Sequence, residues 1–148
     1  SAEIYKHFDL GLINSTTRFV YQKTSEDSLL NIPEYNLYQS IYLEHLWRFK
    51  ATEGELLWQV GVDYKYTSNY TPDGYMPPLG LFYTQNTQEP DAYQGLDLFI
   101  NVKIKRLRIY LKYSYLNTAI NENYYLTSPS YPAPDPLFKW GISWTFYD

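Results

Sequence analysis

The stretch Phe138-Lys-Trp-Gly-Ile-Ser-Trp-Thr-Phe146 decides the fold class, because large apolar residues and small or charged residues alternate through all of it. A period of two is typical of a β-strand whose two faces meet different environments. Two tryptophans and two phenylalanines on one face, with nothing bulky on the other, fit the wall of a transmembrane β-barrel. They fit a soluble β-sandwich poorly, because there the small polar face would be the one exposed to water.

The composition narrows the function classes. The chain has 148 residues, enough for one domain, with no cysteine, a net charge of −4 and 18 tyrosines. The lack of cysteine excludes disulfides and thiolate metal sites, and the negative charge argues against a nucleic-acid partner. No apolar run approaches the roughly 20 residues of a spanning helix. Abundant tyrosine is typical of membrane interfaces, where an apolar ring with a polar end is favoured. We recognise no signal peptide, so we expect a mature form or a piece of a longer protein.

Alternation elsewhere predicts about six antiparallel strands in this chain. They are expected near residues 4–23, 37–50, 56–66, 95–103, 107–115 and 138–146. Within the first segment the apolar residues change parity, which indicates either one long strand with a bulge or two strands joined by a turn near Asn14-Ser15. We favour the single strand.

The connections alternate in length, which predicts how the sheet is oriented. Short turns are expected at 51–54 and at Lys105-Arg106, whereas 24–36, 67–92 and 117–137 are long. Outer-membrane barrels have long extracellular loops and short periplasmic turns, so the long segments are expected outside the cell. Two hairpin registers follow. Ile104 should face Leu107 across the lysine-arginine turn, and Phe49 should face Leu56, with Trp47 facing Trp58.

Parity then assigns residues to the two faces. The predicted lumen-facing residues are Glu44, Asp63, Lys65, Asp97, Lys103, Arg108 and Lys112. The predicted lipid-facing residues are Trp47, Trp58, Val60, Ile100, Ile109, Leu111, Trp140 and Trp144. The lumen charges could select solutes by charge, or they could simply be a solvated wall paired with other strands. The basic residues around Lys103 and Arg108 could favour anionic solutes or anchor the periplasmic rim.

The sequence gives little support for catalysis or metal binding. Asp63 and Asp97 could suggest a glycosidase pair, but nothing in the sequence sets their separation. His7 and His45 are far apart without clustered carboxylates, so we expect no metal site, and no serine is placed to make His45 catalytic. The loop aromatics could stack on sugars or pack the loops and an outer aromatic girdle: Tyr70, Tyr75, Phe82 and Tyr83. We therefore expect no enzyme and no cofactor.

Residues 75–86, 96–117 and 131–146 resemble the C-terminal part of the Bacteroidetes-type putative porins. The resemblance implies an outer-membrane β-barrel of a Gram-negative bacterium in contact with outer-membrane lipid. Family members are several times longer, so residues 1–148 would be the C-terminal segment of a larger barrel, completed by additional strands of the same polypeptide or of another chain. The alternative is a self-contained barrel of about eight strands, with extra strands near Ile4 and Leu81. The chain end also resembles the signal read by the barrel-assembly machinery: Lys139, Gly141, Trp144 and Phe146. Unlike many barrels, Tyr147 and Asp148 follow the final aromatic residue.

Three functions stay open at this point. The first is a porin that lets small hydrophilic solutes diffuse passively across the outer membrane. The second is a structural barrel subunit of a larger outer-membrane assembly, without an open channel. The third is a soluble, secreted β-sandwich that binds glycans.

Overall fold

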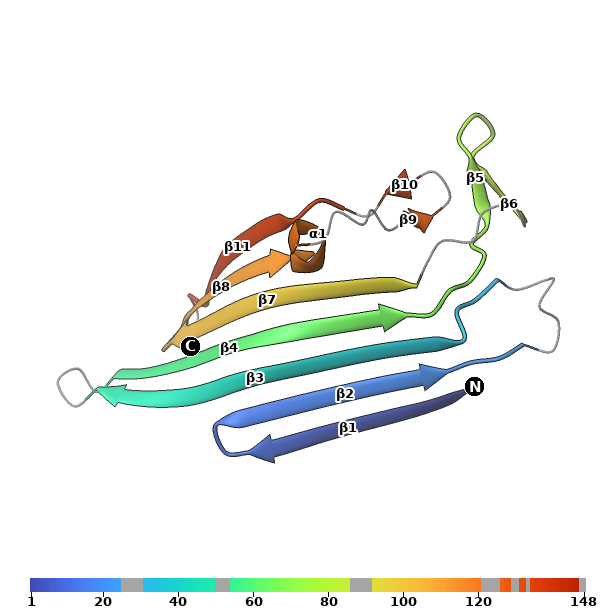
Figure 1. Ribbon diagram of the computed structural model, residues 1–148. Coiled ribbons are helices and arrows are strands. Elements are labelled where there is room, and N and C mark those ends of the chain that lie inside the picture. The colour runs from blue at the N-terminus through green and yellow to red at the C-terminus, as the bar shows by residue number, and fades with distance from the viewer. Residues whose placement is uncertain are drawn as a thin grey trace.

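The computed structural model describes residues 1–24, 31–49, 54–85, 92–120, 126–128, 131–132 and 134–146. Seven antiparallel strands form one sheet, in which each strand pairs with the next long strand along the chain (Figure 1). In order across the sheet they are β1 (Ala2–Leu10), β2 (Ile13–Tyr21), β3 (Tyr35–Phe49), β4 (Gly54–Thr67), β7 (Tyr93–Ile104), β8 (Leu107–Ser114) and β11 (Leu137–Trp144). The all-β antiparallel prediction is confirmed.

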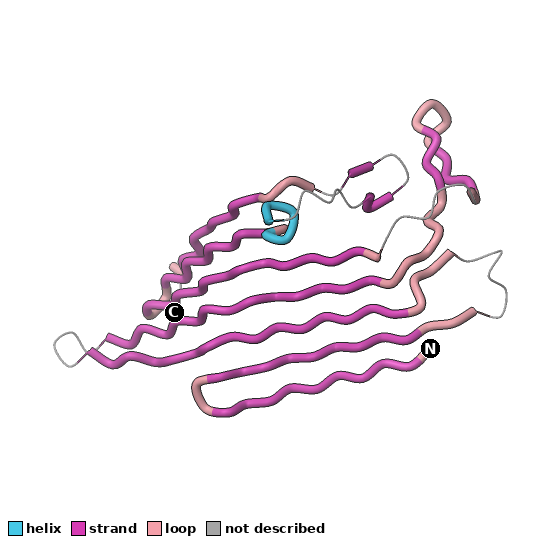
Figure 2. The backbone as a smooth tube through the Cα atoms, in the orientation of Figure 1, coloured by secondary structure: helices cyan, strands magenta, loops and turns pink. Residues whose placement is uncertain are grey.

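Smaller elements interrupt the meander. Two short hairpins, β5 (Gly74–Met76) with β6 (Leu81–Tyr83) and β9 (Leu126–Ser128) with β10 (Tyr131–Pro132), form sheets of their own, and α1 (Leu116–Ile120) follows β8. All of them lie at the end of the sheet where β4 ends and β7 begins (Figure 2). The tight turns at 11–12 and 105–106 lie at the opposite end, so long and short connections are segregated as the sequence predicts.

The prediction of a single strand over residues 4–23 is wrong. Two strands, β1 and β2, pair along their whole length, and the turn between them comprises Gly11 and Leu12. Gly11 has a φ of +80°, and its N–H donates to the Asp9 carboxylate at 2.9 Å. Glycine at the first central position is typical of two-residue hairpin turns, which explains the parity change without a bulge. The main sheet therefore has seven strands rather than about six.

The two predicted hairpin registers have different outcomes. Ile104 pairs with Leu107, as predicted, although Lys105 adopts a φ of +52° that non-glycine residues avoid. The register predicted for β3 and β4 is wrong by two residues, because Trp47 pairs with Leu56 and Phe49 with Gly54. A slip of two keeps every side chain on its face, so the predicted faces are unaffected. The turn predicted at 51–54 lies, apart from Gly54, outside the described residues.

The sheet is a single layer. No hydrophobic side chain among the described residues is buried, and the buried polar ones are Asn14, Ser40, Asp63, Gln85, Asp97 and Ser114. This distribution contradicts the β-sandwich hypothesis, because a sandwich buries the apolar faces of two sheets against each other. The outer edges of β1 and β11 each lack a strand partner within the described part of the chain, so the sheet is not closed. None of the described residues forms a helix with the length and apolarity of a membrane span.

Candidate functional site

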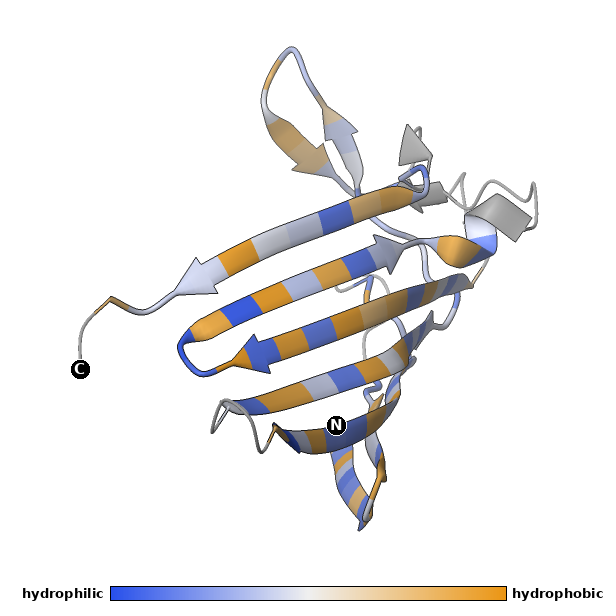
Figure 3. Ribbon diagram, turned by 90° about the vertical axis from the view of Figure 1, so that its left-hand side faces the viewer, coloured by the Kyte–Doolittle hydropathy of each residue, from blue (hydrophilic) through white to orange (hydrophobic). Residues whose placement is uncertain are grey.

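Hydrophilic and hydrophobic residues alternate along the long strands (Figure 3), and the cross-strand pairing aligns most residues of like character, so the sheet has a polar face and an apolar face. Directly paired residues in an antiparallel sheet project to the same side. One apolar row runs Trp47, Leu56, Ile104, Leu107 and Trp144, and another runs Leu43, Val60, Ile100, Leu111 and Trp140. The polar row between them runs Glu44, Gln59, Asn101, Tyr110 and Gly141.

The eight residues predicted to face lipid all belong to the apolar face. Six of them lie in the two apolar rows above, and the remaining two, Trp58 and Ile109, lie in a third row with Val102 and Ile142. Of the four tryptophans on this face, Trp140 at 65%, Trp144 at 59% and Trp47 at 51% are well exposed, whereas Trp58 is half-buried. At one end of the face Trp47, Trp58 and His45 pack edge to face with ring centroids 6.1–6.3 Å apart. That this face touches lipid stays a prediction.

The seven residues predicted to face a lumen share the polar face. The structure brings four of them into one ion-paired network, Asp63, Lys65, Asp97 and Lys112. Glu44 lies outside that network, bound to a side-chain amide. Lys103 and Arg108 lie directly opposite each other at the end nearest the Lys105-Arg106 turn. The polar face is hollowed, with a depression of about 370 Å³ over the middle of β3, β4, β7 and β8.

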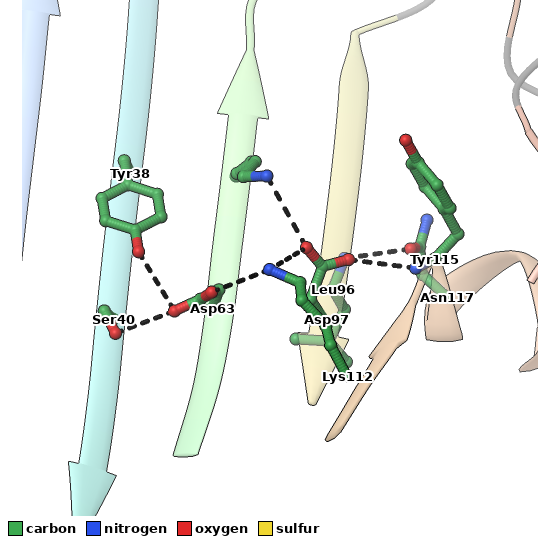
Figure 4. A network of polar contacts seen from close by, with 9 residues as sticks. Tyr38, Ser40, Asp63, Leu96, Asp97, Lys112, Tyr115 and Asn117 are labelled. Atoms are coloured by element: carbon green, nitrogen blue, oxygen red, sulfur yellow. Dashed lines mark hydrogen bonds and ion pairs between the residues drawn. The ribbon is translucent and has the colours of Figure 1, made fainter. Parts of the chain in front are cut away.

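Lys112 lies at the centre of the network (Figure 4). Its Nζ lies 3.2 Å from Asp63 Oδ2 and 3.0 Å from Asp97 Oδ2, and Lys65 Nζ lies 3.6 Å from the same Asp97 oxygen. Asp63 and Asp97 are direct cross-strand partners, an arrangement that repels unless a cation bridges them. The two carboxylates that could suggest glycosidase chemistry are thus held by a lysine between them.

Hydroxyl and backbone donors complete the network. Asp63 Oδ1 accepts hydrogen bonds from the Ser40 hydroxyl at 2.8 Å and the Tyr38 hydroxyl at 3.1 Å. Asp97 Oδ1 accepts the backbone N–H of Tyr115 at 3.0 Å, just where β8 ends. Both carboxylate side chains are nearly buried, at 11% and 7% exposed. Buried carboxylates need such partners, and this network therefore ties β3, β4, β7 and β8 together.

Amide side chains extend the polar row next to Glu44. Gln59 donates to the Glu44 carboxylate and accepts a hydrogen bond from Asn101 at 3.1 Å. Sequence reasoning did not single out Gln59 or Asn101. Their parity alone places them on the polar face, but the hydrogen bonds depend on a cross-strand register that parity leaves open.

Two glycines of the polar face are covered by aromatic rings. A Cβ added to Gly61 would lie 2.7 Å from Phe99 Cζ, and one added to Gly141 would overlap the Tyr110 ring. Each pair is in direct cross-strand register. The rings therefore lie flat along the sheet over the glycines, an arrangement in which an aromatic side chain shields the backbone left bare by the missing Cβ.

The histidines and loop aromatics lie apart from this network. His7 is 2.9 Å from the Thr16 hydroxyl, and His45 packs against tryptophans. Within the described ranges no three histidine, aspartate or glutamate side chains gather as a metal site would require. Tyr75 and Phe82 pack on each other in the β5–β6 hairpin, with centroids 5.0 Å apart.

A comparison with protein families decides the identity. The model of a family described as Putative porin matches residues 1–148, the whole chain. The chain belongs to this porin family. The match also covers residues 1–74, which lie outside the segments that carry the resemblance read from the sequence. Neither the curated proteins nor the solved structures contain a match to the chain.

The end of this porin-family chain shows how the predicted assembly signal is arranged. Lys139 and Gly141 lie on the polar face of β11, whereas Trp144 belongs to the apolar face and its ring stacks on Phe146 at 6.0 Å. The Thr145 N–H still donates to Arg106 at 3.3 Å, so pairing with the neighbouring hairpin continues past Trp144. Recognition of these residues by the assembly machinery stays a prediction.

Proposed function

We propose that this chain forms part of the wall of an outer-membrane β-barrel in a Gram-negative bacterium, through which small hydrophilic solutes diffuse passively. One observation supports this most directly: the exposed face of the sheet is aliphatic and aromatic, while the buried side chains are polar. A water-soluble protein has the opposite distribution. A barrel in a bilayer needs this one, because its outside meets hydrocarbon and its inside meets water.

The distance between the aromatic residues at the two ends of the apolar face is close to the height of the apolar band of an outer-membrane barrel. On β4 the outward residues run from Trp58 through Val60 and Val62 to Tyr64 and Tyr66. Eight residues at about 3.3 Å each, inclined by about 40°, span roughly 20 Å of membrane depth. The apolar band of outer-membrane barrels is about 25 Å tall between its two aromatic girdles. We propose that Trp58 and Tyr66 lie near the two interfaces.

The open edges of β1 and β11 require additional strands. Small single-chain barrels have about eight strands, and unpaired backbone groups in hydrocarbon each cost several kcal/mol. We propose that residues 1–148 form one segment of a larger barrel and that strands of the same polypeptide or of another chain complete it. The barrel-assembly machinery would insert it by reading the residues around Gly141 and Trp144.

The test is reconstitution of the full-length polypeptide. We expect it to fractionate with the outer membrane of a Gram-negative host, to form stepwise ohmic channels in planar bilayers, and to admit small sugars in liposome-swelling assays with rates that fall with sugar size. A protein that inserts as a folded barrel but stays electrically silent would instead support the structural-subunit hypothesis. A protein that stays in the soluble fraction without detergent would refute both.

A further inference from the structure

Lys103 and Arg108 form a pair of like charges on the polar face. They are direct cross-strand partners on β7 and β8, and both are exposed. In the described part of the chain neither makes an ion pair with a carboxylate, although Arg18, Arg48, Lys65 and Lys112 all do. Like charges directly opposite each other destabilise a sheet unless something neutralises them.

The same sheet shows how such a pair is neutralised elsewhere. Asp63 and Asp97 are also like charges in direct register, and the Lys112 ammonium lies between them within 3.2 Å of both. The row that contains Lys103 and Arg108 has the reverse polarity but no bridging group. Its other members are Leu46, Leu57 and Ser143, none of which carries a charge.

The space around the basic pair suits a small anion. Lys103 and Arg108 line a hollow of about 590 Å³ with four other polar residues, Gln59, Asn101, Tyr110 and Ser143, and with the aliphatic Leu57, Val102 and Ile109. Serine and tyrosine hydroxyls can donate to an oxyanion, an arginine guanidinium can bind one in bidentate fashion, and a lysine adds a point charge. The tryptophan-rich rows lie on the opposite face, so the pair is directed away from the surface proposed to meet lipid.

We propose that Lys103 and Arg108 form a subsite for a small phosphate- or carboxylate-bearing solute on the lumen wall, near the end with the short turns. This deepens the proposed function and rests on it, since the solute reaches the site through the pore. In this subsite an anion from solution bridges the two cations, just as the Lys112 ammonium bridges the two aspartates. It gives the channel a preference for anions at this end of the wall.

The test compares the full-length protein with the double variant Lys103→Gln/Arg108→Gln in planar bilayers. The matched control is Lys6→Gln/Lys23→Gln, which removes the same charge from a residue in register with Thr17 on the other face and from a residue beyond the end of β2. Two quantities are measured: the reversal potential in a KCl gradient, and inhibition of the chloride current by inorganic phosphate. We expect the double variant to lose anion preference and to bind phosphate about tenfold more weakly, the scale of one charge-assisted hydrogen bond. The control should behave as wild type.

A second readout separates this inference from the pore hypothesis. Phosphate binding to the detergent-solubilised protein is followed by broadening of the ³¹P NMR signal, which needs no conductance. A wild type that binds phosphate but never conducts refutes the pore and keeps the subsite. Unchanged phosphate binding in the double variant refutes the subsite, and so does a double variant whose only change is lower stability, because a carboxylate of another strand would then be the partner.

The source of the anion is tested by the lipid. Phosphate inhibition should be equal in phosphatidylcholine and phosphatidylglycerol bilayers. If phosphate inhibited the current in phosphatidylcholine but not in phosphatidylglycerol, the anionic phosphatidylglycerol headgroup would already occupy the basic pair. That result would overturn the assignment to a soluble solute.

Discussion

Replacing Lys112 by methionine tests the physical account of the polar face. The variant Lys112→Met removes the cation that lies within 3.2 Å of both Asp63 and Asp97 and leaves two carboxylates in direct register. Cross-strand Cβ atoms are about 5 Å apart, so at an effective dielectric constant of about 20 the carboxylates repel by about 3 kcal/mol. Lys65, at 3.6 Å from Asp97, offsets part of this repulsion. We expect the free energy of unfolding to fall by about 2–3 kcal/mol.

The measurement is denaturant unfolding of the full-length barrel in detergent, followed by tryptophan fluorescence. Adding Asp63→Asn to Lys112→Met should restore most of the loss, because the asparagine oxygen can still accept the Ser40 and Tyr38 hydroxyls while the repulsion is gone. The control is Lys139→Met, which removes a lysine that faces Lys112 on the next strand and has no ion pair within the described residues. Its stability should change by less than about 1 kcal/mol. A fall below about 1 kcal/mol for Lys112→Met, or no rescue by Asp63→Asn, would refute the reasoning.

Three further predictions concern packing, the turn and the two faces. Gly141→Val should push the Tyr110 ring off the sheet, lower single-channel conductance and cost about 1–3 kcal/mol of stability; unchanged conductance would contradict the flat-ring geometry. Lys105→Gly should stabilise the barrel by about 1 kcal/mol in unfolding experiments, because glycine adopts the φ of +52° without the Cβ clash. Leu111→Arg should cost about 2–4 kcal/mol in lipid, whereas Tyr110→Arg on the opposite face should cost much less; equal losses would show that the faces do not differ in environment.

The faces of the sheet could be predicted from sequence because side-chain direction in a strand depends only on parity. The lumen set and the lipid set each lie together on one face, including Glu44 on β3 and Arg108 on β8. Even the register error between β3 and β4 left the faces intact, since the slip was two residues.

The turns and the side-chain networks were harder to predict from the sequence. The extra strand depended on Gly11, whose positive φ starts a turn that composition alone did not separate from a bulge. The partners of Asp63 come from β3 and β8, 23 or more positions away in sequence, so no local pattern indicates them. Long-range register is set by turn geometry and by closure of the whole sheet, and neither is encoded in parity.

The flat rings of Phe99 and Tyr110 bear on how constant the cross-section of the proposed channel is. Long side chains that project into a channel change rotamer within picoseconds to nanoseconds, and the free width fluctuates with them. The rings that lie against Gly61 and Gly141 cannot move closer to the backbone, and because they lie along the sheet they project little into the channel. At these two positions the clearance available to a solute is therefore set by the strands themselves, and a single added methyl group at either glycine would narrow it.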